Sequence, residues 1–304
     1  MARKLDFATT LTDSQSYIGE QALQYILAAF LKNKTADAGV TIVQDIKQSA
    51  YVAKLSGSSL VKVGDNCSFS ASGTIVAAEA QLTPKTMFIN TELCYNDLEA
   101  LWNAVDGANQ NTQNLTADFN AALIAVLTDA MNTSFEDAIW NGVYDATGVT
   151  VTALFNGIDA QITTHALTGN TFTKSNIVGE VDAAMNAVPE AVLEDTAGLR
   201  IWMNNKSALF YKQALMSLGL NTPADAQLTT YDGIQINTIG KIADNKLYVI
   251  HPKNIALGVG AMDNFSQVQI LDMRQTTGDN SIRLKLQGKV DVKLVYEAEA
   301  VSRG

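Results

Sequence analysis

Residues 115–140 read LTADFNAALIAVLTDAMNTSFEDAIW, and Asn141 and Gly142 follow. Apolar and small side chains recur there at steps of three and four residues, the spacing that gathers them on one face of an α-helix. Thr116 is a candidate N-cap, Asp118 suits the positive end of the helix dipole, and Gly142 is a candidate C′ residue. The stretch predicts one long helix whose apolar face contains Phe119, Leu123, Val126, Leu127, Ala130, Met131, Ser134 and Ala138.

At 1.5 Å per residue this helix would span roughly 38 Å, and helices usually have only ~11–12 residues. A helix of that length also fits an ordinary core helix of a large domain. The helix alone therefore does not distinguish an ordinary large domain from a specialised fold, and the sequence around it supplies the further evidence.

The composition narrows the class of protein. The chain has 304 residues, 47% hydrophobic and 17% charged, with a net charge of −10. This composition is typical of a globular protein. Because an acidic protein gains no free energy by releasing the counterions of nucleic-acid phosphates, dedicated nucleic-acid binding is disfavoured. Two isolated cysteines, Cys67 and Cys94, suggest a reducing compartment rather than a disulfide framework.

The sequence predicts neither a membrane span nor a signal peptide. No stretch reaches the ~18 apolar residues that a membrane span needs, and the N-terminus lacks an apolar h-region. Because the chain begins with Met1, we expect no N-terminal propeptide to have been removed.

The N-terminal third predicts an arm rather than a core. Residues 14–32 show helical periodicity and should form an amphipathic helix, packed either on its own core or on a neighbouring subunit. Residues 40–55 are rich in β-branched side chains and predict extended structure. The apolar stripe of the predicted helix contains Ile18, Ala22, Tyr25, Ile26, Ala29 and Phe30.

Residues 56–73 are rich in serine and glycine, and predict a long, polar β-hairpin. Short apolar runs at 60–63 and 74–77 flank a Gly64-Asp65-Asn66 turn signal. A two-stranded ribbon with little apolar surface is marginal on its own. This hairpin therefore needs a partner, either from its own chain or from another copy.

The rest of the chain predicts a mixed α/β fold with no internal repeat. A strand around Met87 and Ile89 leads to a short helix near Asn96 and a loop at 103–114. The helices end at Pro189 and Gly219. The predicted helices span 175–188 and 206–218, and the predicted strands span 199–203, 234–239, 246–250 and 255–259.

The last stretch shows the cleanest period-2 pattern and predicts a hairpin with one buried face. A turn at Gln287-Gly288 would separate its two strands. The alternating apolar residues are Ile282, Leu284 and Leu286, then Val290, Val292, Leu294 and Tyr296.

No residue qualifies as catalytic, cofactor-binding or metal-binding. His165 and His251 lie far apart with no ligand pattern around them, and are expected to be structural. The run from Gly258 to Asp263 begins like a dinucleotide fingerprint but has Asp at the third glycine position. Several other polar and sulfur-containing side chains also have ordinary explanations: Glu190, Glu194 and Asp195 as a solvated turn, Glu297 and Glu299 as surface on a terminal strand, and Met203, Met216 and Met262 as core filler.

The N-terminal arm and the polar hairpin cannot bury enough apolar surface within one chain, which indicates that they pack on neighbouring subunits. Subunit contacts that are heterologous build rings or lattices. The order of these elements resembles the major capsid proteins of tailed bacteriophages, the Hong Kong 97-like fold. The resemblance rests on four stretches: residues 78–85 with 96–99 as the exit of the hairpin, 135–142 with Asn156-Gly157-Ile158 as the end of the spine helix, 184–189 with 201–205 as the start of the axial domain, and 263–266 as the return to the peripheral domain.

The resemblance implies an α+β fold with four parts. Residues 1–40 would be an N-terminal arm with its amphipathic helix, and 41–95 an extended β-hairpin (E-loop) with its exit strand. Residues 96–150 and 262–304 would form a peripheral domain with the long spine helix, and 151–261 an α/β axial domain. Only about 40 residues precede the hairpin, so we expect no large fused scaffold.

The resemblance also implies the function: a non-enzymatic shell protein that assembles as hexamers and pentamers into the icosahedral virion shell around double-stranded DNA, in the bacterial host's cytoplasm. Scaffolding, portal and decoration proteins would be possible partners, with no cofactor, no membrane and no sequence-specific nucleic-acid binding. Some family members cross-link a hairpin lysine to a neighbour, and Lys54, Lys62 and Lys85 lie in or near the hairpin. Two alternatives stay open: an encapsulin-type nanocompartment shell, and an α/β enzyme or ligand-binding protein without a recognised motif.

Overall fold

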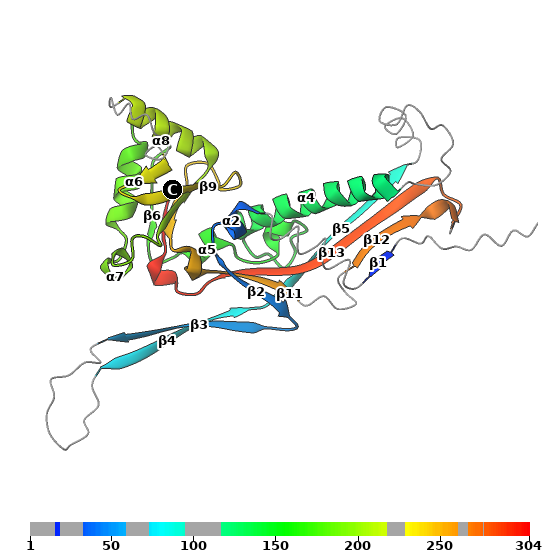
Figure 1. Ribbon diagram of the computed structural model, residues 1–304, viewed down its shortest axis with the longest axis horizontal. Coiled ribbons are helices and arrows are strands. Elements are labelled where there is room, and N and C mark those ends of the chain that lie inside the picture. The colour runs from blue at the N-terminus through cyan, green and yellow to red at the C-terminus, as the bar shows by residue number, and fades with distance from the viewer. Residues whose placement is uncertain are drawn as a thin grey trace, which may run out of the picture. The chain divides into compact units, whose positions relative to one another are not determined.

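A computed structural model describes residues 16–18, 33–58, 73–94, 117–217, 229–260, 267–275 and 277–304 (Figure 1). Contacts divide the chain into two compact units. Unit 1 comprises Met1–Ala28, Phe88–Asp129 and Met262–Gly288; unit 2 comprises Ala29–Met87, Ala130–Ala261 and Lys289–Gly304. Helix α4 (Ala117–Asn141) and the strands β5 (Lys85–Cys94) and β13 (Ser281–Leu294) contribute residues to both units.

In unit 1 the strands pair antiparallel around β13. Its residues 282–286 pair with β12 (Gln267–Asp272), which in turn pairs with β1 (Ser16–Ile18). On β5, Glu92 accepts a hydrogen bond from the Ser281 hydroxyl and lies 3.3 Å from Arg283. A 3₁₀ turn at Met273–Gln275 follows β12.

Strand β1 corrects the prediction of a helix at residues 14–32, because residues 16–18 are extended. The edge of β12 offers them a full set of backbone partners, and such pairing outweighs a weak helical periodicity. The remainder of that predicted helix lies outside the described residues. The described helix nearest to it is α2 (Lys34–Asp37), capped by the Asn33 side chain.

The predicted C-terminal hairpin is also wrong, because β13 is one strand of 14 residues that continues through Gln287 and Gly288. Its buried apolar side chains keep a single phase from Ile282 to Leu294, whereas a tight turn would have folded the strand back on itself. Tyr296 lies beyond the end of the strand and is 38% exposed. Glu297 and Glu299 lie in a 3₁₀ turn, Glu297–Glu299, rather than in a strand.

Unit 2 contains a second sheet, in the order β6-β14-β10-β7-β9-β8. The β7–β9 and β14–β6 pairs are parallel and the others are antiparallel. The predicted strands in this part of the chain are confirmed to within two residues. The strands are β6 (Ala166–Leu167), β7 (Arg200–Met203), β8 (Thr230–Tyr231), β9 (Ile234–Thr238), β10 (Leu247–Ile250) and β14 (Val301–Arg303).

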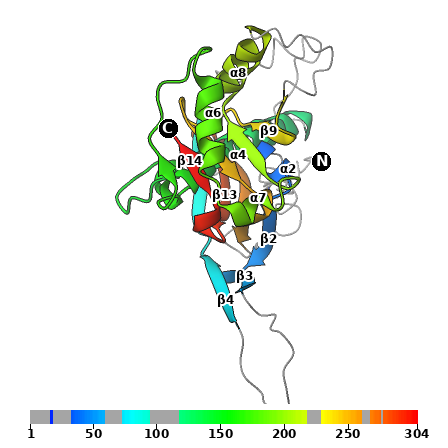
Figure 2. The same cartoon turned by 90° about the vertical axis from the view of Figure 1, so that its left-hand side faces the viewer.

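Two helices cover one face of this sheet (Figure 2). They are α6 (Ile177–Asn186) and α8 (Asn205–Ser217), both close to their predicted spans. Side chains alternate along a strand, so β7 directs Ile201 and Met203 toward these helices. Short helices α5 (Ile158–Gln161) and α7 (Glu190–Leu193) complete this part of the chain.

On β7 and β10, Trp202 and Tyr248 alternate with the side chains that pack against these helices, and they meet Trp140 at the end of α4. The Trp140 ring lies 5.3 Å from that of Trp202 and 5.2 Å from that of Tyr248. All three are fully buried. Their polar atoms are paired, as buried indole and phenol groups require: Trp140 with Thr35, Trp202 with the Ile250 carbonyl and Tyr248 with Asp159.

The predicted extended stretch 40–55 forms two strands of unit 2, β2 (Thr41–Ile46) and β3 (Ala50–Ser58). β2 pairs parallel with β11 (Ile255–Gly260), whose other edge pairs with residues 290–294 of β13. Asp45 has a left-handed φ of 60° where the β2–β11 register shifts. This β-bulge bends the chain before it enters β3.

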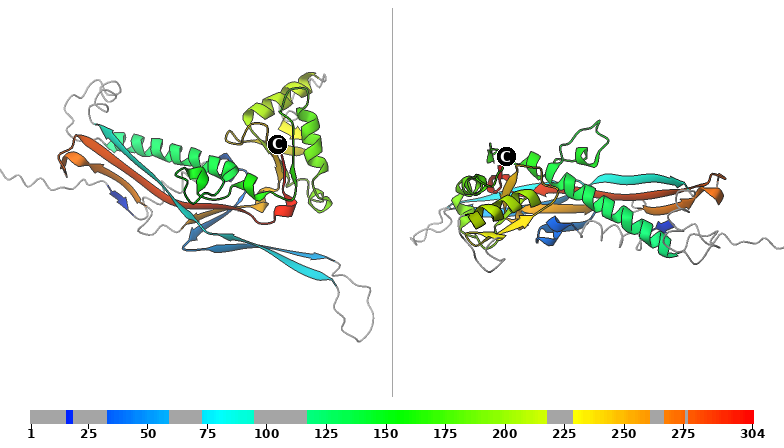
Figure 3. Two further views of the ribbon diagram at one scale, coloured as in Figure 1. Left: turned by 180° about the vertical axis from the view of Figure 1, so that it is seen from behind. Right: turned by 90° about the horizontal axis from the view of Figure 1, so that it is seen from above.

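Helix α4 confirms the predicted long helix, with 25 residues (Figure 3). Its buried face differs from the predicted one. Val126 is 67% exposed and Ala130 is exposed, although both were expected on the buried face. The bulky Phe135 and Ile139, which the predicted stripe omitted, fill the core instead. Among residues 125–141, the part of this helix whose side chains are described, the buried positions are Thr128, Met131, Phe135, Ala138, Ile139 and Trp140.

Helix α4 ends before Gly142, as predicted, but for a different reason. Gly142 does not have a positive φ. Instead the Gly157 amide donates to the Gly142 carbonyl at 2.8 Å. A Cβ on Gly142 would lie 2.5 Å from the Ala138 oxygen, and one on Gly157 would lie 2.6 Å from the Gly142 nitrogen. Close approach of two backbones therefore requires glycine at both positions.

We expect Gly157→Ala to lower the free energy of unfolding by about 1–3 kcal/mol, because backbone atoms cannot move away from the new methyl group. Gly179→Ala is the matched control: Gly179 lies in α6 with no atom within 4 Å of a new Cβ. That substitution should raise stability by about 0.5–1 kcal/mol. Urea unfolding of both variants checks this, and equal stabilities would contradict it.

Several predictions fall outside the described residues. They are the Gly64–Asn66 turn with its 60–63 strand and Lys62, the helix near Asn96, the 103–114 loop, the Thr116 cap, the buried side chains of Phe119 and Leu123, the Gly219 stop, Cys67, Met262 and the 263–266 stretch. The described cysteine, Cys94, is free and exposed.

Candidate assembly site

The most distinctive element of unit 2 is a two-stranded ribbon formed by β3 and β4 (Thr74–Leu82). The strands pair antiparallel from Ala50↔Leu82 to Ser58↔Thr74, and pair with no other described strand. Figures 1 and 3 show them side by side over their whole length. This agrees with the hairpin predicted for this region, and the predicted strand at 74–77 is confirmed.

One face of the ribbon exposes large apolar side chains to solvent. Residues directly opposite in an antiparallel pair share a face, and alternate residues share it too. The register therefore places Tyr51, Leu55 and Ile75 on the same face, where they are 64%, 71% and 65% exposed. This apolar face, as it is called below, also carries the exposed residues Ala53, Ala77, Glu79 and Gln81. Exposed apolar side chains of this size are typical of a protein–protein contact.

The opposite face packs on the body of unit 2 where the ribbon begins. Leu82 is fully buried, and it forms a cluster with Ile46, Ala256 and Val295. Ala50 and Val52 pack against the same cluster. A fully buried leucine contributes about 1.5–3 kcal/mol relative to an exposed one, so this cluster fixes the base of the ribbon.

Polar contacts hold the ribbon to the C-terminal segment. The Lys54 ammonium lies 2.5 Å and 2.6 Å from the two carboxylate oxygens of Glu299, and 5.8 Å from the centre of the Tyr296 ring. Where β4 ends, the Thr83 amide donates to Asp291 at 2.7 Å. Burial raises the pKa of Asp291, and this hydrogen bond offsets part of the shift.

Glu297 is a structural acceptor rather than the surface group predicted from sequence. Its Oε1 atom accepts hydrogen bonds from the amides and hydroxyls of Thr163 and Thr164, at 2.6–3.1 Å. These bonds lower the pKa of Glu297 to about 2. The carboxylate therefore ties the loop before β6 to the C-terminal segment.

The lowered pKa of Glu297 means that its contribution to stability is complete above pH about 4.5 and is lost as the pH falls toward 2. Between pH 6 and pH 3 the native chain should lose about 1–2 kcal/mol more than Glu297→Gln, after discounting for solvent near the carboxylate. Urea unfolding at both pH values measures this. Glu190→Gln, which changes an exposed carboxylate on α7, should behave like the native chain.

The residues weighed as chemical candidates do not form one site. The two glycines of the dinucleotide-like run, Gly258 and Gly260, are both in strand β11. His251 Nδ1 accepts from the Lys253 amide, and Nε2 lies 3.6 Å from Asp195. Burial lowers the pKa of His251. The carbonyl of His165 accepts from the Ser302 amide at the edge of the sheet.

Some smaller expectations need correction. Glu190 belongs to α7, whereas Glu194, the C-cap of that helix, and Asp195 lie in the turn that follows it. Met203 is core as expected, but Met216 is 54% exposed. In the described ranges no group of three or more His, Cys, Asp or Glu could hold a metal ion. No described helix is long and apolar enough to cross a membrane.

Sequence reasoning anticipated the ribbon but missed its anchors and its apolar face. Lys54 and Glu299 are 245 positions apart, so no local pattern links them. The apolar face was partly visible in the i, i+4 spacing of Tyr51 and Leu55, but joining them to Ile75 needs the register of the ribbon.

Comparisons with known proteins were made by sequence and by structure. No family model matches the sequence, and no curated protein matches it either. The structure is similar to a chain of the satellite phage P4 procapsid that includes the size-determination protein Sid, with a TM-score of 0.68 and 10% identity. The match covers 95% of this chain and 93% of that chain.

Two further structures show the same similarity. A chain from the capsid of an empty GTA particle matches with a TM-score of 0.58 and 11% identity, over 91% of this chain and 89% of that one. A chain from the capsid of Myoviridae phage XM1 matches with a TM-score of 0.56 and 10% identity, over 88% of this chain and 90% of that chain. The chain thus has the Hong Kong 97-like fold of tailed-phage capsid proteins, as the sequence resemblance implied.

Proposed function

We propose that this protein is the major capsid protein of a tailed phage, a subunit that assembles into the icosahedral shell around double-stranded DNA. The supporting observation is the fold, which is shared with capsid chains over about nine-tenths of both sequences. The work of such a subunit is mechanical and depends on contacts between copies.

The domain assignment made from sequence is part of this proposal. Residues 1–40 serve as the N-terminal arm, and 41–95 as the E-loop and its exit strand. Residues 96–150 and 262–304 form the peripheral domain, whose spine is α4, and 151–261 form the axial domain. Copies join as hexamers and pentamers in the host cytoplasm and remain in the virion, with scaffolding, portal or decoration proteins as further partners.

The ribbon is the element that we expect to join neighbouring subunits. Its exposed apolar face would be covered by a second copy, because burying Tyr51, Leu55 and Ile75 at an interface gains free energy that folding leaves unused. The Lys54–Glu299 pair and the Leu82 cluster hold the base of the ribbon in place. A pre-organised base reduces the ordering cost of that contact.

The Leu55 side chain provides a direct test. Leu55→Asn should leave the free energy of unfolding within about 0.5 kcal/mol of the native value, because this side chain is solvent-exposed in the subunit. Assembly should need at least about tenfold more protein, since each copy loses roughly 1.4 kcal/mol or more of interface energy. Leu55→Met keeps the apolar surface and is the matched control. Light scattering against concentration measures both, and normal assembly by the Asn variant would contradict the role of this face.

Expression of the chain alone tests the function as a whole. After size-exclusion chromatography, negative-stain microscopy should show hollow, roughly isometric shells or rings of subunits. Trimming residues 56–80 should leave a folded protein that no longer assembles. A monomer that resists assembly across salt and pH would overturn the capsid proposal. Particles that enclose a cargo enzyme in the native source would point instead to a nanocompartment shell.

A further inference from the structure

Residues 143–150 form an exposed loop of unit 2 shortly after the end of α4. Every residue of this loop is exposed, and the Val149 side chain is 100% exposed, so folding leaves it entirely in water. Val143 and Tyr144 are 63% and 55% exposed. Outside the ribbon and this loop, the exposed large apolar side chains of the described residues occur singly along the chain. Exposed apolar side chains gathered on one loop indicate an interaction surface.

Hydrogen bonds hold the loop in a defined conformation. The Val143 amide donates to the Thr152 carbonyl at 2.8 Å, and the Asp145 amide donates to the Ala153 carbonyl at 3.0 Å, which closes the loop at its base. Within the loop, the Asp145 carboxylate accepts from the amide and the hydroxyl of Thr147, at 2.9 Å and 2.8 Å. Because these groups are already paired in the free subunit, a partner would not have to order the loop on binding.

The low charge of the loop suits a contact between copies of this chain. Every copy has a net charge of −10, so copies repel one another, and a close contact between them needs surfaces that carry little charge. Asp145 is the only charged residue between Gly142 and Ile158, and Thr147 binds its carboxylate. The apolar face of the ribbon likewise carries one charged residue, Glu79.

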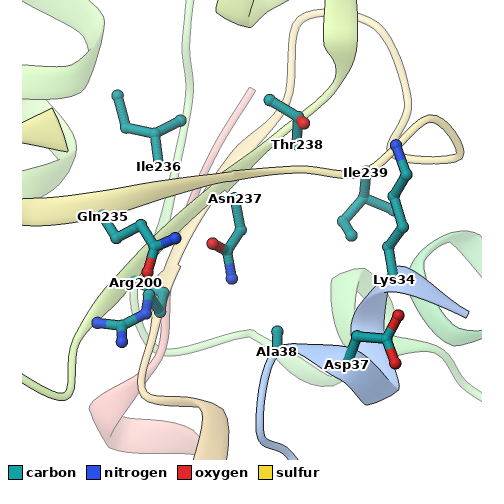
Figure 4. A pocket seen from close by; sticks show the side chains of 9 residues that line it. All are labelled: Lys34, Asp37, Ala38, Arg200, Gln235, Ile236, Asn237, Thr238 and Ile239. Atoms are coloured by element: carbon teal, nitrogen blue, oxygen red, sulfur yellow. The ribbon is translucent and has the colours of Figure 1, made fainter. Parts of the chain in front are cut away.

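A groove beside β9 is less suited to such a contact. It has a volume of 520 Å³, and its lining includes the charged side chains of Lys34, Asp37 and Arg200 and the carboxamides of Gln235 and Asn237 (Figure 4). An apolar occupant would remove these polar groups from water without replacing their hydrogen bonds, which costs free energy. The loop does not impose that cost, because its most exposed side chain is a valine.

The ribbon supplies the counterpart that the loop needs. Its apolar face exposes Tyr51, Leu55 and Ile75, and burying them gains most free energy against another apolar surface. Among the described residues of unit 2, the loop is the place outside the ribbon where large apolar side chains are exposed close together in the sequence. The two surfaces therefore match in polarity and in charge.

We propose that the loop at residues 143–150 is the docking site for the ribbon of a second copy, with Val149 packed against the apolar face beside Leu55. This inference rests on the proposed self-assembly and names the surface that the ribbon meets. The contact is heterologous, since a loop on one copy meets a ribbon on the next. Contacts of that kind generate rings when the rotation closes.

Two substitutions of Val149 test the role of the loop. Val149→Asn should leave the stability of the subunit unchanged, because this side chain is fully exposed. Assembly of this variant should need at least about fivefold more protein, because the interface loses apolar area. Val149→Ile keeps the apolar surface and should assemble like the native chain. Light scattering against concentration measures assembly, and near-UV circular dichroism of the Trp140–Trp202 cluster verifies folding.

A double-mutant cycle tests whether the ribbon is the partner of the loop. If Val149 and Leu55 meet across the interface, Leu55→Asn already removes the group against which Val149 packs, so the two effects should not multiply. The double variant should then need no more than about twice the protein that Leu55→Asn alone needs. If the two effects multiply in full, the loop contacts a different surface and the proposed pairing is wrong.

The outcomes distinguish this inference from the proposed function. If the native chain forms shells and Val149→Asn assembles normally, the loop is not a contact, and the shell proposal stands. If Val149→Asn impairs assembly while Leu55→Asn does not, the ribbon is not the partner of the loop, and the shell proposal again stands. If the native chain never associates, both proposals fall.

Discussion

The contact on which unit 2 depends is the end of α4. The Trp140 ring lies just over 5 Å from Trp202 and Tyr248, and two residues further along the chain Gly142 and Gly157 bring two backbones into hydrogen-bond contact. Neither feature tolerates a change of side chain: the three rings are fully buried, and a Cβ on either glycine would overlap backbone atoms. The helix end, the sheet and the α2 segment are therefore fixed to one another by a single closely packed region.

Carboxylates near the C-terminal end of the chain bind groups that lie far away in the sequence. Glu297 accepts four hydrogen bonds, Glu299 binds Lys54, and Asp291 accepts the Thr83 amide. Arg303 pairs with Glu180, whose side chain is 5% exposed. Part of the acidic character of this chain is thus internal, where it satisfies distant backbone donors instead of facing solvent. Two of these contacts hold the ribbon: Lys54 within β3 binds Glu299, and Thr83, directly after β4, donates to Asp291.

Folding leaves one face of the ribbon exposed, the face that carries Tyr51, Leu55 and Ile75. Exposed apolar side chains of this size on a pair of strands are typical of a protein–protein contact. The proposed assembly can use this face, because burying apolar area supplies free energy.

The sequence alone determined the elements whose signal is local: the long helix from its three-and-four periodicity, the strands from their alternation, and the ribbon from its serine- and glycine-rich composition. Tertiary structure decided what pairs with what. The alternation on either side of Gln287-Gly288 is confirmed for residues 282–286 and 290–294, but one strand replaced the expected hairpin, and residues 16–18 joined β12 as a strand. Neither the Lys54–Glu299 anchor nor the shared face of Leu55 and Ile75 could be predicted, because periodicity reports which faces are buried, while register and distant partners depend on the whole chain closing at once.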